Sequence, residues 1–406
     1  MSELSYLEKL LDGVEVEWLP LGEITKYEQP TKYLVKAKDY HDTYTIPVLT
    51  AGKTFILGYT NETHGIYQAS KTPVIIFDDF TTANKWVDFD FKAKSSAMKM
   101  VTSCDDNKTL LKYVYYWLNT LPSEFAEGDH KRQWISNYSQ KKIPIPCPGN
   151  PEKSLAIQAE IVRILDKFTA LTAELTAELN MRKKQYNYYR DQLLSFKDGE
   201  VEWKTLGEIG DFTYGYAAKA MDSGDARFVR ITDINKDGKL SKENPMYVEL
   251  NEENEKYTLD KNDLLMARTG ATFGKTMIFE EDYPAVYAGF LIKLNLNKTI
   301  INAKYYWHFA QSDFFWEQAN KLVSGGGQPQ FNANALKQVR VPIPYPSHPQ
   351  KSLDEQGRIV DILDKFDAIA ASITEGLPRE IELRQKQYEY YRDLLFSFPK
   401  PETASN

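Results

Sequence analysis

The feature that most constrains the fold of this chain is an internal repeat. The segment VEWLPLGEI at residues 16–24 returns as VEWKTLGEI at 201–209, and IPIP at 143–146 returns as VPIP at 341–344. Farther along, IVRILDKF at 161–168 matches IVDILDKF at 359–366, and YYRD at 188–191 matches YYRD at 390–393. Ordered motifs that occur twice predict two structurally equivalent halves. We call these shared segments the frame.

Two long inserts, residues 25–142 and 210–340, lie between the frame segments and show little similarity to each other. This pattern is expected when two modules occupy equivalent places but recognise different things. Neutral drift of one half after duplication is the alternative, although drift would blur the frame as well as the inserts. Residues 6–11 also echo residues 189–194, so the repeat is nearly circular and predicts a pseudo-two-fold arrangement.

A long helix is predicted near the end of each half. Apolar residues recur at a spacing of three and four from Ile157 to Phe196, which is typical of a coiled-coil seam. The second helix is interrupted at Gly376 and Pro378, which predicts a stop and a restart with Pro378 in a first turn. The first helix carries a duplicated tetrapeptide, a stutter that adds about 6 Å. Its two copies are Thr172, Ala173, Glu174, Leu175 and Thr176, Ala177, Glu178, Leu179.

The inserts combine strand-like segments with an aromatic-rich helix each, at residues 110–121 and 303–322. The sequence therefore predicts an α+β fold in which two mixed α/β domains are separated by two long antiparallel coiled-coil helices, with a pseudo-two-fold internal repeat. The predicted boundaries are 1–148 for the first domain, 149–200 for the central helix, 201–346 for the second domain and 347–406 for the C-terminal helix.

Composition excludes several classes of protein. The 406 residues are 42% hydrophobic and 26% charged, as in a globular protein, and no apolar run approaches the length of a membrane span. Glu3 and Glu8 stand where a secretory signal would be basic, so we expect a cytoplasmic protein with no membrane partner. Two cysteines and five scattered histidines predict no disulfide framework and no metal site. The net charge of −7 argues mildly against nucleic acid.

Polar loops follow the aromatic helix of each insert, at residues 128–134 and 325–332. They contain the side chains that pair with base edges, because Arg and Lys reach guanine and Gln and Asn pair with adenine. Ordinary surface loops are the alternative. The predicted DNA-binding residues are Lys53, Lys85, Lys131, Arg132, Gln133, Trp134, Arg230, Arg268, Thr269, Lys275, Gln328, Gln330 and Asn332.

No motif in the sequence predicts catalysis. Residues 270–276 resemble a phosphate-binding loop but have three residues between the glycines where four are needed. Residues 244–247, Asn-Pro-Met-Tyr, nearly match an adenine methyltransferase signature without a glycine-rich cofactor motif. Asp78 and Asp79 follow an apolar strand and most simply end it in solvent. We therefore predict no catalytic residues.

The repeated LGEI, PIP and YYRD motifs, with QxxIVxILDKF at 158–168 and 356–366, resemble the specificity subunits of type I restriction-modification systems. The tandem tetrapeptide makes the chain similar to the type IC subfamily. The resemblance covers essentially the whole chain. It implies two target-recognition domains that each read half of a bipartite asymmetric site in double-stranded DNA.

The same resemblance implies partners and cofactors. Two modification subunits would methylate adenine with S-adenosylmethionine, and restriction subunits would use ATP and Mg²⁺ to translocate and cleave DNA. None of these cofactors is expected to bind this chain, which would only choose the site. We further hypothesise that the duplicated tetrapeptide acts as a ruler for the spacer between half-sites. The alternatives are a coiled-coil adaptor without DNA selectivity and an enzyme with a cryptic nuclease or methyltransferase site.

Overall fold

The computed structural model describes residues 10, 13–36, 39–51, 54–122, 132–197, 199–325, 327–371 and 376–399. Packing divides the chain into two compact units, the first Met1–Glu174 with Glu382–Asn406 and the second Leu175–Ile381. Each unit thus contains one insert and parts of both long helices. The four-part division along the chain stays a prediction, because the packing joins segments that are distant in sequence. The boundary between Glu174 and Leu175 falls inside the duplicated tetrapeptide.

A two-stranded antiparallel sheet closes the base of each insert. In the first unit β1 (Val16–Pro20) pairs with β9 (Lys142–Pro146), and in the second β10 (Val201–Thr205) pairs with β18 (Arg340–Pro344). The register is the same, since Trp18 lies opposite Pro144 and Trp203 opposite Pro342. Two-stranded sheets have only edge strands, which tolerate proline. Short helices follow, α2 (Leu21–Ile24) and α6 (Leu206–Ile209).

The first insert folds around a four-stranded sheet of order β2-β8-β5-β6 and a three-stranded sheet of order β4-β3-β7. The central strand β5 is buried on both faces, because Ile75 and Phe77 pack with the helices while Val74 and Ile76 pack toward the smaller sheet. The elements are β2 (Thr25–Glu28), η1 (Pro30–Tyr33), β3 (Ile46–Leu49), β4 (Ile56–Thr60), β5 (Val74–Asp78), β6 (Asn84–Val87), β7 (Lys92–Ala93), β8 (Met98–Ser103), α3 (Leu111–Leu118), α4 (Gln133–Ser136) and η2 (Tyr138–Gln140).

The second insert has sheets of the same sizes, with orders β11-β17-β14-β15 and β13-β12-β16. Its predicted single aromatic helix is two helices, because the Ser312 hydroxyl caps the N-terminus of α8. The elements are β11 (Gly210–Tyr214), β12 (Ala226–Val229), η3 (Ile231–Asp233), β13 (Tyr247–Val248), η4 (Glu255–Tyr257), β14 (Leu264–Ala267), η5 (Gly270–Thr272), β15 (Thr276–Ile278), β16 (Ala285–Tyr287), β17 (Leu291–Leu296), α7 (Ala303–Phe309), α8 (Asp313–Leu322) and α9 (Ala333–Leu336).

The long helices carry the rest of the frame. Helix α5 (Pro151–Leu193) has 43 residues and contributes to both units, and α10 (Pro349–Ala371) is followed by α11 (Leu377–Leu395). Helix α11 begins one residue before Pro378, so the predicted stop and restart is confirmed. No helix among the described residues is long and apolar enough to cross a membrane.

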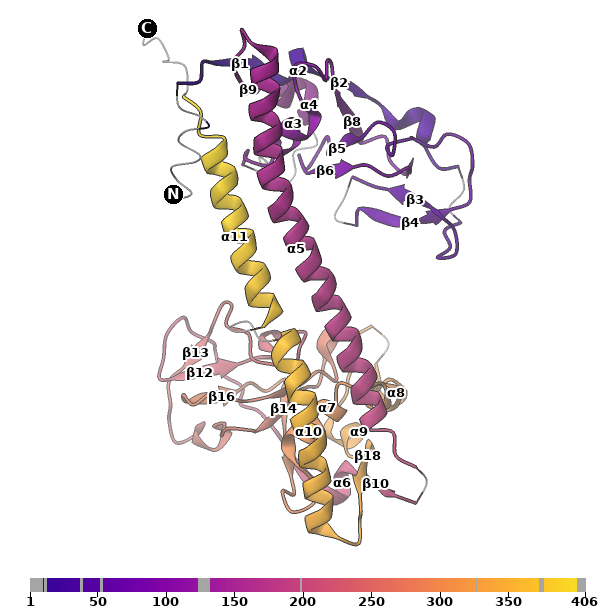
Figure 1. The fold of residues 1–406 in the computed structure, drawn as a ribbon. Helices are drawn as coiled ribbons and strands as arrows, with labels where there is room; N and C mark the ends of the chain where they lie inside the picture. The colour runs from indigo at the N-terminus through magenta and orange to yellow at the C-terminus, as the bar shows by residue number, and fades with distance from the viewer. Residues whose placement is uncertain are drawn as a thin grey trace. The chain divides into compact units, whose positions relative to one another are not determined.

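The helices run antiparallel within each unit (Figure 1). In the first unit the ring of Phe168 on α5 stacks on Tyr391 of α11, with centroids 5.3 Å apart. In the second unit Phe366 on α10 stacks on Tyr189 of α5 at 5.2 Å. These residues are partners in the sequence repeat, so the two contacts are equivalent. The predicted fold class and internal repeat are confirmed.

Candidate nucleic-acid interface

Each insert is fastened to its long helix by a buried glutamine. Gln158 Oε1 accepts a hydrogen bond from Leu110 N at 2.9 Å, and its Nε2 donates to Lys108 O at 3.0 Å. Gln356 Oε1 accepts from Asn302 N at 2.8 Å, and its Nε2 donates to Ile300 O at 2.9 Å. Both glutamines are fully buried. The frame therefore holds unlike inserts by the same hydrogen bonds.

A carboxylate about two helical turns farther along makes a second contact between each long helix and its insert. Asp166 binds Lys112 at 2.9 Å and accepts from the Tyr116 hydroxyl. Asp364, its repeat partner, binds Lys304 at 2.8 Å and His308 Nε2 at 2.9 Å. These contacts hold α3 and α7 against the long helices α5 and α10.

In the first insert, one of the predicted DNA-binding residues is buried in the interior of the domain. Trp134 is only 2% exposed and packs edge-on against Phe77, with ring centroids 4.9 Å apart. A bulky indole next to an apolar sheet face gains more from burial than from exposure. Arg132 beside it is exposed, whereas Gln133 is half-buried and its Oε1 accepts a hydrogen bond from Asn137 Nδ2 at 3.4 Å.

The residue that fixes this loop is Asp79, which the sequence did not single out as a binding-site residue. Its carbonyl accepts from Gln133 N and its carboxylate accepts from Trp134 N, both at 2.8 Å. Asp78 and Asp79 are 5% and 1% exposed, so the expectation that they end the strand in solvent is wrong. Asp79 is compensated by the equally buried Lys99, whose Nζ lies 3.4 Å from Oδ2. The pair pins the start of α4.

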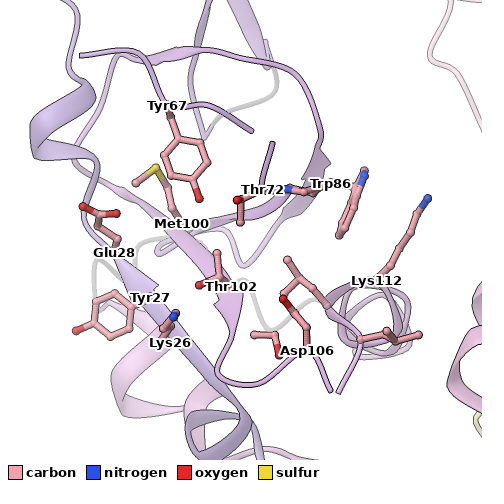
Figure 2. Close-up of a pocket in the computed structure, with 14 residues that line it drawn as sticks. Lys26, Tyr27, Glu28, Tyr67, Thr72, Trp86, Met100, Thr102, Asp106 and Lys112 are labelled. Atoms are coloured by element: carbon pink, nitrogen blue, oxygen red, sulfur yellow. The ribbon is translucent and has the colours of Figure 1, made fainter. Parts of the chain in front are cut away.

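The other predicted residues of the first insert lie apart from this loop or cannot be placed. Lys85 is exposed on β6, while Lys53 and Lys131 lie outside the described residues. A hollow of about 630 Å³ lies nearby, and Figure 2 shows Trp86 and Lys112 together in its wall, 5.3 Å from ammonium to ring. Its charged lining residues are two lysines and two acids, so it offers phosphate no net attraction. They are Lys26, Lys112, Glu28 and Asp106.

In the second insert the structure brings several predicted residues together. Gln330 Nε2 donates to the Thr269 hydroxyl at 2.7 Å, which links the segment after β14 to the polar loop. Arg268 precedes Thr269, and Gln328 and Asn332 are exposed on the same loop. Asn332 also caps α9, since its Oδ1 accepts from Ala335 N. Thr269 is buried at 4% exposure, so it supports this surface from below.

Two further predicted residues lie elsewhere in the second insert. Arg230 is held by Asp233, whose carboxylate binds Nη2 at 2.9 Å and Nε at 3.1 Å, so its guanidinium is engaged within the domain. This hydrogen bonding raises the pKa of Arg230. Lys275 lines a separate basic pocket of about 390 Å³ with Lys183, Arg190 and Lys236. Sequence patterns do not predict these placements, because they depend on contacts between segments that are distant in sequence.

Comparison with known proteins decides the family. The model of the type I restriction modification DNA specificity domain matches twice, at residues 13–182 and 199–383, and so covers most of the chain. The chain belongs to this family. Its two matches coincide with the two halves of the internal repeat. Membership of the type IC subfamily stays a prediction.

Relatives of this specificity subunit are similar to it over all or nearly all of their lengths. A type I restriction enzyme specificity subunit of Escherichia coli is 66% identical, with 100% of both chains covered. The EcoprrI specificity subunit of Escherichia coli is 34% identical over 92% of this chain and 93% of its own. The crystal structure of an S subunit from M. genitalium shares the fold, with a TM-score of 0.57 at 14% identity over 96% of this chain and 98% of that chain.

Metal-binding side chains do not gather in this specificity subunit as far as the structure describes it. Over the described ranges, no group of three or more His, Cys, Asp or Glu side chains could hold a metal ion. His41, His64, His308 and His348 bind protein groups or stand apart from one another. The arrangement offers hydrogen-bonding and cationic side chains on loops, which is chemistry for recognition.

Proposed function

We propose that this chain reads a bipartite, asymmetric site in double-stranded DNA, with each insert acting as a target-recognition domain for one half. The observation that carries the proposal is the identical fastening of two unlike inserts. Gln158 and Gln356 hold them with matching hydrogen bonds, yet their exposed loops differ in sequence and in support. A repeated frame with unlike reading loops suits a site whose two halves differ.

The long helices are proposed to set the spacer between the half-sites. Helix α5 is continuous through the duplicated tetrapeptide, so adding or removing one copy changes its length by about 6 Å. About two base pairs of DNA span a similar length, because a helical turn of 10 pairs rises about 34 Å. Copy number is therefore expected to change the spacer and to leave both half-sites unaltered.

We also propose that the helices dock two modification subunits. Tyr188 is 61% exposed and Tyr390, its repeat partner, is 58% exposed. Each packs edge-on against the following tyrosine with the same geometry, 5.3 Å between centroids and 76° between planes. Exposed tyrosines are common anchors in protein interfaces. Two equal surfaces suit two copies of one partner.

Catalysis is proposed to reside in those partners. Modification subunits would bind S-adenosylmethionine and methylate adenine, and restriction subunits would use ATP and Mg²⁺ to translocate and cleave DNA. This chain would supply site choice and no cofactor-binding residues, in the cytoplasm where the DNA lies. A coiled-coil adaptor and an enzyme with a cryptic site, the alternatives raised by the sequence, have no support from the family model or from the relatives.

The test is to express this chain with a type IC modification subunit in a host that lacks adenine methylation, and to map methylated adenines by single-molecule sequencing. We expect one split motif. Replacing residues 25–142 with the insert of a relative should change one half of that motif and leave the other half as the internal control.

Two outcomes would contradict the proposal. Scattered or absent methylation, in a complex shown to assemble, would support the adaptor. Cleavage or methylation of DNA by the purified chain alone would support the enzyme.

A further inference from the structure

An arginine in the second insert is held between two exposed aromatic rings. The guanidinium carbon of Arg268 lies 5.3 Å from the ring centroid of Tyr214 and 5.3 Å from that of Phe290. Tyr214 is 44% exposed and Phe290 is 57% exposed. Large apolar rings gain free energy when they are buried, so core packing does not explain the position of Phe290.

Backbone hydrogen bonds fix all three residues. Arg268 N donates to Phe290 O at 3.1 Å, and Phe331 N donates to Arg268 O at 2.7 Å. The Tyr214 hydroxyl accepts from Ala333 N at 3.1 Å, at the start of α9. Tyr214 is the last residue of β11, Arg268 directly follows β14 and Phe290 directly precedes β17, so all three residues lie at the ends of neighbouring strands of one sheet.

The guanidinium keeps its outer nitrogens available. Arg268 Nε donates to Gly289 O at 3.2 Å, but its Nη1 and Nη2 have no hydrogen bond or ion pair with any residue that the structure describes. Two other arginines of this insert differ, because Arg227 and Arg230 both pair with Asp233. Arg268 thus has two nitrogens, Nη1 and Nη2, that can donate to a ligand, while Tyr214 and Phe290 lie against its guanidinium.

We propose that Arg268 reads a guanine in the half-site of the second insert, with Tyr214 and Phe290 as the residues that position its guanidinium. Two parallel N–H donors match the O6 and N7 acceptors of guanine. Stacking fixes the plane before DNA binds, which reduces the entropy lost on binding. The inference rests on the proposed function, and it adds the base that Arg268 reads and the two residues that position its guanidinium.

The experiment uses the complex with the modification subunit, and reads the motif from methylated adenines and the affinity from competition between duplexes. Arg268→Lys keeps the charge and the stem but removes the fork. We expect its preference for guanine at one position of one half-site to fall about 10- to 100-fold, with the other half-site unchanged. Arg340→Lys, at an exposed arginine of β18 in the same domain, is the matched control and should keep the motif.

Variants of Phe290 test positioning separately from contact. Phe290→Ala should weaken the preference at that same position about two- to five-fold, because the cation loses one stacking partner. Phe290→Tyr keeps the ring and should restore the preference. A residue that served only the stability of the domain would lower methylation at all positions and would show no such rescue.

Three results would overturn the inference. Arg268→Lys could leave every position strict, in which case Arg268 reads no base. Arg268→Ala could weaken binding evenly across all sequences and flatten the salt dependence, which would assign Arg268 to a phosphate. Phe290→Ala could relax a different position from Arg268→Lys. Failure of the proposed function is distinguishable, because the unaltered complex would then give no split motif.

Discussion

The two junctions between insert and helix share the same glutamine and lysine–aspartate contacts, but the side chains around the aspartate differ. In the first unit Asp166 is met by the Tyr116 hydroxyl and Lys112, and Thr169 lies 3.2 Å from that hydroxyl. In the second unit His308 replaces the tyrosine and Asp367 replaces the threonine. Lys239 adds a further ion pair with Asp367 at 2.6 Å. Both junctions share a lysine–aspartate ion pair, to which the first adds two hydroxyl groups and the second adds further charged side chains.

The difference shows how an identical frame accommodates unlike inserts. The glutamine side chains bond to main-chain groups of the insert, so these contacts do not depend on the side chains of the insert. The carboxylate contacts are made by side chains on α3 and α7, which diverged. In the second unit Glu280 also binds Lys304 at 3.0 Å, which brings a loop of the insert into the same charge cluster. The frame therefore makes the same glutamine contacts in both units, while each insert supplies different side chains to the aspartate.

The largest expected loss of stability follows from replacing the buried glutamine of either unit, and it should be equal in the two units. Replacing Gln158 or Gln356 with Met keeps the chain length but leaves main-chain groups at the junction without their partners. Each change should cost about 3 kcal/mol, because an unsatisfied buried group costs about 1 to 3 kcal/mol. Amide hydrogen exchange of the full chain should show faster opening near Leu110 or near Asn302, respectively. Gln350→Met, on the exposed start of α10, is the control. Unequal costs would show that the two fastenings are not equivalent.

The next effect should separate the junctions. Lys304→Met removes two ion pairs at once, those with Glu280 and Asp364, and because all three side chains are about one-third exposed the loss should destabilise the second unit by about 1.5 kcal/mol. Lys112→Met removes a partly exposed pair, with side chains 31% and 36% exposed, and should cost about 0.5 kcal/mol. Chemical denaturation followed by hydrogen exchange would measure both. Similar costs for the two variants would contradict the charge-cluster interpretation.

A smaller effect concerns pH. Burial lowers the pKa of His308 below 6.5, and this outweighs the opposing hydrogen bond and charge of Asp364. A neutral ring fits the site, since Nε2 can donate to Asp364 while Nδ1 accepts from Tyr186 at 2.8 Å. Between the folded and unfolded pKa values the unfolded chain binds more protons, so stability falls as the pH drops below about 6.5.

The first unit should not share this loss, because Tyr116 stands in place of His308 and burial raises the pKa of that tyrosine. Exchange rates measured from pH 7.5 downward, corrected for intrinsic exchange, should reveal the loss in the second unit alone. His308→Tyr copies the first junction, leaves Asp367 unchanged and should abolish the difference. A pH response that survives this substitution must come from another group.

The smallest expected effect lies where the short frame helices begin. Thr205 and Glu208 form a capping box in the second unit, with Thr205 N donating to Glu208 at 2.6 Å. This hydrogen bonding, led by the Thr205 hydroxyl, lowers the pKa of Glu208. Pro20 occupies the Thr205 position in the first unit and makes no side-chain cap. Thr205→Ala should cost about 0.5 to 1 kcal/mol by thermal denaturation, whereas Glu23→Ala should be nearly neutral.

Local sequence patterns predicted the frame well. The three-four spacing of apolar residues predicted α5 because helix periodicity is a local property, and Pro378 predicted the restart of α11 because a proline restricts its own backbone. The repeated segments predicted two equivalent halves, and the structure pairs the first and last strands of each half in the same register. These features need no knowledge of distant contacts.

The candidate interface was predicted less completely. Arg132 and Gln328 are exposed and stay predicted DNA-binding residues, but Trp134 is buried because Phe77, distant in sequence, offers an apolar surface. The role of Asp79 depends on the same fold, since it meets main-chain groups more than fifty residues away. Residue type indicated which side chains suit DNA, and packing decided which of them face outward.

The sequence by itself determined the internal repeat, the helical frame and the family, because ordered motifs and helix periodicity are written along the chain. Only the tertiary structure decided that the junctions are chemically different and that Arg268 stands between Tyr214 and Phe290. The physical reason is that charge pairing and ring stacking act over a few ångströms. Residues separated by tens of positions reach that distance only after the strands and helices have packed.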